Sequence, residues 1–210
     1  MKEISGLYVI VDPHQMGGKD LVAITRLISE GGADIIQLRN KLDPEQIVLE
    51  QAKKIKEVCK INNTVFIVND RMDISKLVGA DGVHVGRDDT PVETCRKYLG
   101  ENFIIGNSNS TFKEAQQSSS LNLDYVAIGS LFETKTKKDT MPSSVEVIRN
   151  LKTSGYSTPI VGIGGINKER VLQVIDAGAN AVCISSAITQ SSKPKIETQE
   201  IKKLMLSYEK

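Results

Sequence analysis

The sequence has no charge excess, no long apolar run and no regular spacing of cysteines. Its 27 Lys and Arg residues nearly balance its 26 Asp and Glu residues, so charge gives no reason to expect a nucleic-acid or membrane partner. No apolar run approaches the length of about 18 residues that a membrane span requires. The apolar stretch Leu7–Val11 is too short for a secretory signal and is typical of a first strand.

The cysteines and histidines are few and form no familiar catalytic or metal-binding set. Cys59, Cys95 and Cys183 share neither metal-type nor redox-type spacing, which indicates reduced thiols in a cytoplasmic protein. The two histidines, His14 and His84, have no metal-ligand partner nearby, and no Ser–His–Asp arrangement is present. His84 alternates with apolar neighbours, so we expect it to be a hydrogen-bonded structural residue.

What the sequence does contain is a short β-branched run repeated eight times at even spacing. The segments between these runs have helical periodicity; in residues 48–59, for example, apolar side chains fall at i, i+4, i+7 and i+11. Strict alternation of strand and helix implies parallel strands joined by right-handed crossovers. The predicted strands are Leu7–Val11, Asp34–Leu38, Thr64–Val68, Gly82–Val85, Phe103–Ile105, Tyr125–Ile128, Pro159–Ile163 and Ala181–Ile184.

Eight such units in 210 residues close most economically into a barrel, although such barrels usually need about 250 residues. No linker or low-complexity segment divides the chain. We therefore predict an α/β protein in which residues 1–210 form a single domain, an eightfold β/α barrel (TIM barrel).

Capping residues mark where the predicted helices begin and end. We expect Asp43 to be the N-cap of the second helix, with Pro44 in its first turn. The pair Gly31-Gly32 is expected to end the first helix. The tripeptide Gly-Ala-Asp at 32–34 and 79–81, with a near copy at 178–180, is expected to join a helix to the next strand. Residues 191–210 are expected to form the last helix.

Polar and charged side chains follow most of the predicted strands, at the barrel face where such folds place their active sites. Arg39, Lys41 and Lys137 are cations at this mouth, as expected for a multiply charged phosphate. Asp70 and Asp89 follow adjacent strands. Because Mg²⁺ is usually held by one or two carboxylates plus substrate oxygens, this pair predicts a magnesium–diphosphate site.

The last two strands end in small residues. Gly164-Gly165 follows the seventh strand, and Ser185-Ser186 follows the eighth. Barrels commonly bind a phosphate at this point through backbone N–H groups. The two pairs together therefore predict a second phosphate site.

In order along nearly the whole chain, these motifs resemble those of the thiamine phosphate synthase family. The motifs are Gln37-Leu38-Arg39-Asn40-Lys41, Val68-Asn69-Asp70-Arg71, the segment 79–86 (GADGVHVG), Thr134-Lys135-Thr136-Lys137, the segment 162–166 (GIGGI) and the segment 185–188 (SSAI). The resemblance implies a Mg²⁺-dependent transferase that joins a pyrimidine methyl diphosphate to a thiazole phosphate, with or without a carboxyl group on the thiazole. The products would be thiamine phosphate and diphosphate.

The resemblance also implies roles for particular residues. Asp70 and Asp89 would hold Mg²⁺. The residues implied to bind the two substrates are Gln37, Leu38, Arg39, Asn40, Lys41, Asn69, Ser108, Thr134, Lys135, Thr136, Lys137, Gly165, Ser185 and Ser186. Those from residue 134 to 136, with Gly165 and the two serines, would bind the thiazole phosphate. The residues implied to bind the pyrimidine diphosphate are Gln37, Arg39, Lys41, Asn69, Ser108 and Lys137. Arg39, Lys41, Ser108 and Lys137 would be the catalytic ones.

Three positions depart from the family's pattern. The family usually has Glu where Asn40 stands, often Pro where Glu133 stands, and commonly His where Ser110 stands. We expect the first two changes to tune the site without loss of activity. The role of Ser110 stays open.

Three other functions are known for barrels of this kind or can be envisaged for one. A thiazole tautomerase of the same fold would use acid–base chemistry, typically with a His near strand five, where this chain has Ser110. A phosphate-binding barrel enzyme like those of tryptophan biosynthesis would need a Lys and Glu pair inside the strands, and none is evident. A barrel without activity that senses thiamine phosphates would not need Asp70, Asp89 and Lys137 together. The sequence leaves the oligomeric state undetermined.

Overall fold

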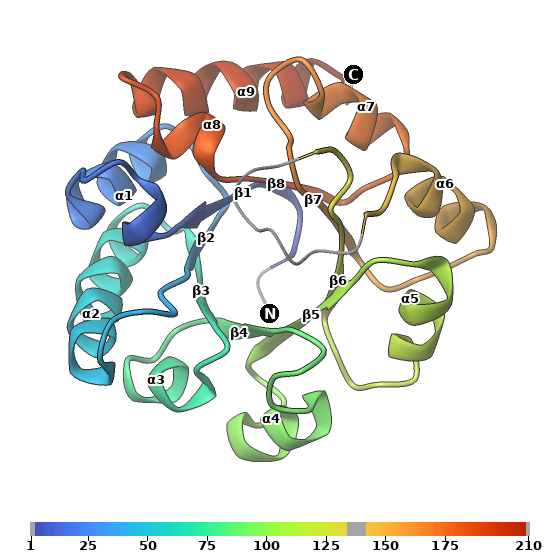
Figure 1. The fold of residues 1–210 in the computed structure, drawn as a ribbon, viewed down its shortest axis with the longest axis horizontal. Helices are drawn as coiled ribbons and strands as arrows, with labels where there is room; N and C mark the ends of the chain where they lie inside the picture. The colour runs from blue at the N-terminus through green and yellow to red at the C-terminus, as the bar shows by residue number, and fades with distance from the viewer. Residues whose placement is uncertain (1–2, 134–141, 209–210) are drawn as a thin grey trace.

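In the computed structural model, which describes residues 3–133 and 142–208, eight parallel strands close into a barrel in chain order (Figure 1). Each strand pairs with the next, and β8 pairs back to β1. The strands are β1 Gly6–Val11, β2 Ile35–Leu38, β3 Val65–Asn69, β4 Gly82–Val85, β5 Ile104–Asn109, β6 Tyr125–Ile128, β7 Ile160–Ile163 and β8 Ala181–Ile184. The predicted eightfold barrel is confirmed.

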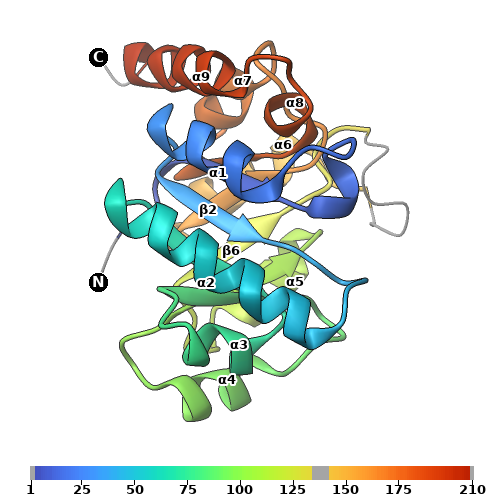
Figure 2. The same cartoon turned by 90° about the vertical axis from the view of Figure 1, so that its left-hand side faces the viewer.

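Helices surround the ring of strands and cover its outer face (Figures 1 and 2). They are η1 Pro13–Gln15, α1 Leu21–Glu30, α2 Glu45–Ile61, α3 Met72–Leu77, α4 Val92–Leu99, α5 Phe112–Ser118, α6 Val145–Thr153, α7 Val171–Asp176, α8 Ser186–Thr189 and α9 Pro194–Tyr208. Among the described residues, no helix is long and apolar enough to cross a membrane. The predicted last helix is confirmed as α9, whereas the single turn of α8 was not foreseen.

Because side chains alternate between the two faces of a strand, the barrel has an inner and an outer core. Leu7 and Val9 of β1 belong to the outer cluster, between strands and helices. Tyr8, between them in sequence, belongs to the inner cluster, which also contains Tyr125 and Cys183. The three cysteines are buried and form no disulfide bond, which agrees with the reduced thiols expected from their spacing.

Two local predictions were wrong. The fifth strand does not end at Ile105 but continues to Asn109, because its polar residues keep pairing with the strands on either side. Asp43 is not the N-cap of α2; Pro44 occupies that position and makes no side-chain cap bond. The Asp43 carboxylate instead accepts a hydrogen bond from Asn40 and binds the ring of His14.

The glycines of the repeated Gly-Ala-Asp segments adopt left-handed backbone conformations, with φ of 97° at Gly32, 62° at Gly79 and 99° at Gly178. Glycine adopts this conformation without the steric cost that a Cβ atom imposes. Each glycine turns the chain from a helix towards the next strand, as predicted.

The residue just before each of β2, β4, β6 and β8 ties the start of that strand to the start of the strand before it. Asp34, just before β2, accepts a hydrogen bond from Leu7 N in β1 at 2.7 Å. The equivalent bonds join Asp81 to Phe66 N at 2.8 Å, Asp124 to Ile105 N at 2.7 Å and Asn180 to Ile160 N at 3.0 Å. We call these four contacts the N-terminal bridges. They recur at every second strand, which gives the barrel an approximate fourfold repeat.

A cation from an outer helix completes each N-terminal bridge. The four cations are Lys202 on α9, Lys56 on α2, Arg96 on α4 and Lys152 on α6, which contact Asp34, Asp81, Asp124 and Asn180 in that order. An amide oxygen serves at Asn180 in place of a carboxylate, which explains why the third copy of the tripeptide tolerates Asn. These hydrogen bonds and ion pairs therefore stabilise the end of the barrel where the strands begin.

Candidate active site

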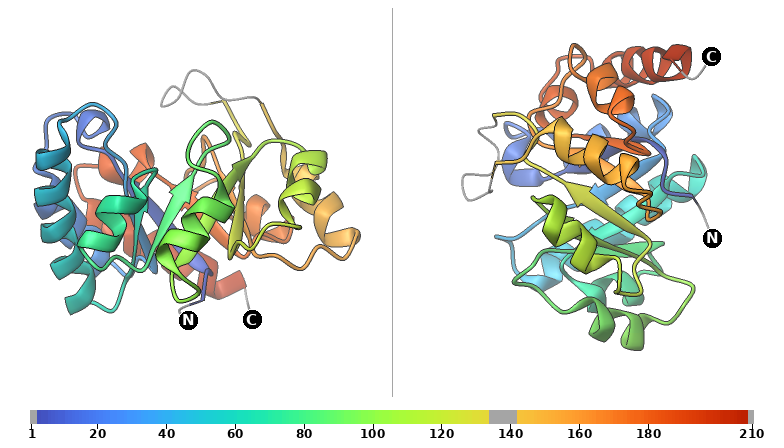
Figure 3. Two further views of the ribbon diagram at one scale, coloured as in Figure 1. Left: turned by 90° about the horizontal axis from the view of Figure 1, so that it is seen from below. Right: turned by 90° about the vertical axis from the view of Figure 1, so that its right-hand side faces the viewer.

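The predicted site residues lie at the opposite end, where the strands finish. Figure 3 shows both ends of the chain on the side where the strands begin, away from this mouth. Gln37 and Asn69 are the penultimate and last residues of their strands, and Ser108 stands next to the end of β5. The strands thus deliver these three polar side chains to one rim, as the sequence predicted.

Arg39 is held by a buried carboxylate that the sequence analysis missed. Its Nη1 atom lies 2.5 Å from Oδ2 of Asp12, whose side chain is only 5% exposed. Asp12 follows β1 directly, and its other oxygen accepts a hydrogen bond from His14 N at 3.0 Å. The position of Asp12 at a strand end was the signal that could have revealed it. Arg39 is therefore aligned by its neighbour and keeps further N–H groups for an anion.

Lys41, Asp70 and Asp89 meet at the rim as one charged cluster. Lys41 Nζ lies 2.7 Å from Oδ2 of Asp70. The Asp70 carboxyl is also within hydrogen-bonding reach of that of Asp89, and Asp89 accepts a hydrogen bond from Gly86 N at 2.8 Å. The two acidic residues predicted to act together are indeed adjacent.

Asp70 is placed so that a cation would stabilise it. Its backbone has a φ of 60°, which is uncommon outside glycine but tolerated by Asp and Asn. Burial raises the pKa of the Asp70 carboxyl, Lys41 lowers it, Asp89 raises it again, and the net direction is upward. Two carboxylates in contact, one of them partly desolvated, are more negative than one lysine can neutralise. By the chemistry of its donors, this pair fits a hard divalent cation such as Mg²⁺.

No group of three or more His, Cys, Asp or Glu side chains lies at metal-binding distance in the described part of the chain. A magnesium ion at this pair would therefore complete its shell with water or phosphate oxygens. That is the usual arrangement for Mg²⁺ at a substrate phosphate.

Gln37 and Ser108 are joined through the barrel interior by three buried aromatic side chains. Gln37 Nε2 donates to Tyr8 Oη at 2.7 Å, and Tyr8 Oη lies 3.0 Å from Tyr125 Oη. His84 contacts Tyr125 Oη through Nδ1 at 3.0 Å and Ser108 Oγ through Nε2 at 2.9 Å. His84 is buried and hydrogen-bonded, as expected, but the two tyrosines were missed because their alternation with apolar residues indicated core alone.

Asn40 serves the shape of its own loop. Its amide nitrogen donates to Asp43 at 2.7 Å and to Gln51 at 2.8 Å. Its amide oxygen accepts from the backbone N–H groups of Leu42 and Asp43. A side chain with both donor and acceptor is required here, which a glutamate would not supply in the same way. The Leu38 side chain packs in the outer core, so only its backbone can face the mouth.

The loop after β7 is glycine-rich because other chain segments crowd it. A Cβ atom on Gly164 would lie 2.2 Å from Ser130 Oγ, and one on Gly165 would lie 2.5 Å from the carbonyl oxygen of Glu133. Both glycines have positive φ, 103° and 64°. Arg170 fixes this loop, since its Nη1 atom donates to Gly165 O at 2.7 Å and its guanidinium carbon lies 4.8 Å from the centre of the Phe132 ring.

The serines after β8 differ from each other. Ser185 donates its hydroxyl hydrogen to Ile10 O at 3.0 Å, so it ties β8 to β1. Ser186 begins the short helix α8. The predicted residues Thr134, Lys135, Thr136 and Lys137 lie outside the described residues. Ser110, where relatives often have His, donates its backbone N–H to Glu114 at 2.6 Å and is 7% exposed.

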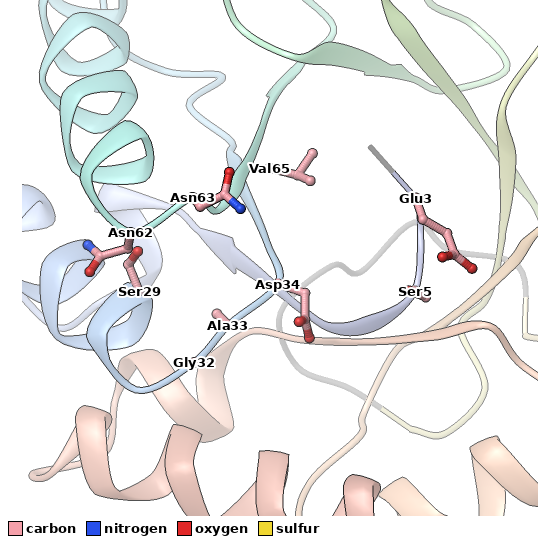
Figure 4. Close-up of a pocket in the computed structure, with 9 residues that line it drawn as sticks. All are labelled: Glu3, Ser5, Ser29, Gly32, Ala33, Asp34, Asn62, Asn63 and Val65. Carbon is pink, nitrogen blue, oxygen red and sulfur yellow. The ribbon is translucent and has the colours of Figure 1, made fainter. Parts of the chain in front are cut away.

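A polar hollow also exists at the other end of the barrel (Figure 4). It is lined by Glu3, Ser5, Ser29, Gly32, Ala33, Asp34, Asn62, Asn63 and Val65. Its central carboxylate, Asp34, already binds Leu7 N and Lys202, and Ser29 already bonds to Thr64. We therefore assign this hollow to the N-terminal bridges, and the mouth remains the candidate active site.

Comparison with known proteins gives one consistent result. The family profile described as Thiamine monophosphate synthase matches residues 7–188. Thiamine-phosphate synthase from Persephonella marina is 37% identical over 202 residues, covering 96% of each chain. The enzyme of the same name from Methanosarcina mazei is 42% identical over 175 residues, covering 81% of this chain and 71% of its own. The solved structure of thiamine phosphate pyrophosphorylase from Pyrococcus furiosus superimposes with a TM-score of 0.88 at 31% identity, with 96% of each chain covered.

Proposed function

Because the chain belongs to the thiamine monophosphate synthase family, we propose that it is the transferase that makes thiamine phosphate at this mouth. The reaction joins a pyrimidine methyl diphosphate to a thiazole phosphate and releases diphosphate. The observation that carries the proposal is the cluster of Lys41, Asp70 and Asp89, with Arg39 two residues before Lys41 in the chain, which suits a diphosphate and its metal ion. A cytoplasmic location remains a prediction.

The reaction needs a stabilised leaving group and no nucleophilic side chain. The bond between the pyrimidine methylene carbon and the diphosphate oxygen breaks, and its electron pair leaves with the diphosphate. The electron-rich aminopyrimidine stabilises the resulting carbocation, and the lone pair of the thiazole nitrogen then forms the new C–N bond. Negative charge builds on the diphosphate oxygens, so fixed positive charge close to them lowers the barrier.

Arg39 and Lys41 supply that charge from the segment that follows β2. The Asp12 carboxylate holds Arg39 in place, and the Asp70 carboxylate holds Lys41. Mg²⁺ held by Asp70 and Asp89 would add positive charge at the leaving oxygens. Lys137, outside the described residues, is proposed as a third cation. Holding both rings at one mouth also makes the coupling step effectively intramolecular.

The two substrates are proposed to occupy different sectors of the mouth. Gln37, Asn69 and Ser108 come from β2, β3 and β5 and would bind the pyrimidine. Gly165 and Ser186 follow β7 and β8, where backbone N–H groups would bind the thiazole phosphate. Residues 134–136 are assigned to the same phosphate by resemblance.

A turnover assay with the purified protein tests the proposal. With both substrates and Mg²⁺ present, thiamine phosphate and diphosphate should form in equal amounts, and omission of either substrate should stop both. Lys41→Met, which keeps the length of the side chain and removes its charge, should lower the rate strongly. Lys97→Met, on the exterior helix α4, is the matched control and should not. A protein that isomerises a thiazole phosphate without releasing diphosphate would instead be a tautomerase.

A further inference from the structure

The five side chains from Gln37 to Ser108 form one unbroken hydrogen-bonded chain across the barrel interior. Its links are Gln37 to Tyr8, Tyr8 to Tyr125, Tyr125 to His84, and His84 to Ser108, with lengths of 2.7, 3.0, 3.0 and 2.9 Å. Both ends belong to the proposed pyrimidine sector. The three middle residues have no assigned part in the reaction.

Packing shows that the middle of this chain is built into the fold. Tyr8 is 1% exposed, Tyr125 0% and His84 8%. The His84 ring stacks on that of Tyr125 at 5.5 Å between centroids. A Cβ atom on Gly106 would lie 2.0 Å from the Tyr125 ring, so β5 has a glycine where the ring needs room. The tyrosine is therefore fixed in position, and its hydroxyl has little freedom to find other partners.

Once the Gln37 amide is oriented with its nitrogen towards Tyr8, the number of hydrogens in the chain fixes every other donor and acceptor. Burial raises the pKa of both phenols well above its ordinary value, so each hydroxyl keeps its one hydrogen at neutral pH. Gln37 donates to Tyr8; Tyr8 then has one hydrogen to pass to Tyr125, and Tyr125 has one to pass to His84 Nδ1. An imidazole with a single proton must carry it on Nε2 and donate it to Ser108.

Any break in this order would leave a buried hydroxyl hydrogen without an acceptor, which costs free energy. The chain therefore has two satisfied states, one running from Gln37 to Ser108 and one running the opposite way with the amide reversed. In the first state Ser108 keeps its own hydrogen for the substrate and Gln37 presents its oxygen. In the second state Ser108 donates its hydrogen to His84, and Gln37 presents its amide nitrogen to the substrate.

We propose that Tyr8, Tyr125 and His84 are positioning residues that couple the two ends of the pyrimidine sector and make Ser108 a hydrogen-bond donor and Gln37 an acceptor. An aminopyrimidine carries ring nitrogens that accept and an amino group that donates, so a site with a fixed donor and a fixed acceptor binds it in one orientation. The inference rests on the proposed function only for the identity of this ligand. The coupling itself is a property of the protein alone.

The proton position on His84 gives a direct test that needs no substrate. The chain has two histidines, so the variant His14→Gln assigns the ring signals of His84 in ¹⁵N NMR. The proposal requires the proton on Nε2. A proton on Nδ1, or on both nitrogens, at neutral pH would overturn it.

A second measurement tests whether the ends are coupled. Gln37→Glu replaces the amide donor by a carboxylate that, once ionised, can only accept. As the pH is raised, the His84 proton should move from Nε2 to Nδ1, although the substitution lies two hydroxyl groups away. Adding Tyr125→Phe should abolish this response. If Gln37→Glu leaves the tautomer unchanged throughout the titration, or the response survives Tyr125→Phe, the coupling does not exist.

Steady-state kinetics test whether these residues affect catalysis. Tyr125→Phe should lower kcat/KM for the pyrimidine diphosphate by about tenfold, the effect of one net hydrogen bond, and leave KM for the thiazole phosphate unchanged. Tyr156→Phe is the matched control, because Tyr156 also loses one hydrogen bond, to Ala115 O, outside the barrel. Equal losses for both substrates, or an equal loss in the control, would overturn the positioning role. If the protein does not catalyse the proposed reaction, the NMR result still stands. The coupling of the two ends and the proposed function are therefore tested independently.

Discussion

The pairing of Arg39 with Asp12 predicts that Arg39→Ala is both inactive and unstable. Asp12 is 5% exposed in its side chain and Arg39 is 24% exposed, so removing the arginine leaves a buried carboxylate without its counter-charge. Breaking a buried pair from one side costs about 3–5 kcal/mol. Because one partner is partly exposed, we expect the lower end, about 3 kcal/mol. In a domain of this size, about 2–4 °C is lost per kcal/mol, so the melting temperature should fall by about 6–12 °C.

Thermal and urea unfolding, followed by circular dichroism, would measure this loss. Adding Asp12→Asn to Arg39→Ala removes the orphaned charge and should restore most of the stability while the enzyme stays inactive. Lys53→Ala, which breaks an exposed pair with Glu50, is the control and should cost less than about 1 kcal/mol. The reasoning fails if Arg39→Ala unfolds like the control, or if the double variant is no more stable than the single one.

Three further predictions concern the metal, the subsites and pH. Chelation by EDTA should abolish coupling and added Mg²⁺ should restore it; full activity in metal-free buffer would refute the metal assignment. Gly165→Val should raise KM for the thiazole phosphate far more than KM for the pyrimidine diphosphate, because the added Cβ lies 2.5 Å from a carbonyl oxygen. Asn69→Ala should do the reverse. Steady-state kinetics with each substrate varied in turn would measure both effects, and a rise in KM for the same substrate in both variants would refute the two sectors. Burial and then Asp89 raise the pKa of Asp70 above its ordinary value. As the pH rises from the ordinary pKa through the raised one, ionisation of this carboxyl therefore lowers the stability of the fold. Asp70→Asn should therefore melt above the wild type at neutral pH without metal, and the two melting temperatures should converge at acid pH; a lower melting temperature for the variant at neutral pH would contradict this.

The sequence predicts the strands and their closure well because burial dictates both. Runs such as Tyr125–Ile128 are apolar on both faces, and even spacing leaves the barrel as the economical closure. The end of β5 was missed for the opposite reason. Its last residues, from Asn107 to Asn109, are polar, and only their pairing with the neighbouring strands shows that they are extended.

The site could be predicted where a charged residue follows a strand, as at Asp70 and Lys41. It could not be predicted where a contact depends on two distant segments. Asp12 carries no sign in the sequence that its partner is Arg39, 27 residues later. The contact between Tyr8 and Tyr125 spans 117 residues, and in a strand pattern a tyrosine is indistinguishable from any other core residue.

The N-terminal bridges have a consequence for how the chain is made. In three of them, the cation and its acceptor lie close in sequence; Arg96 and Asp124, for example, are separated by 28 residues. These contacts can form while the protein is still leaving the ribosome. The fourth joins Asp34 to Lys202 across 168 residues, so the part of the barrel that is synthesised first is completed last. Until α9 arrives, we expect the nascent protein to be an open arc in which β1 and α1 lack the helix that packs against them, a period in which exposed apolar surface favours misassembly.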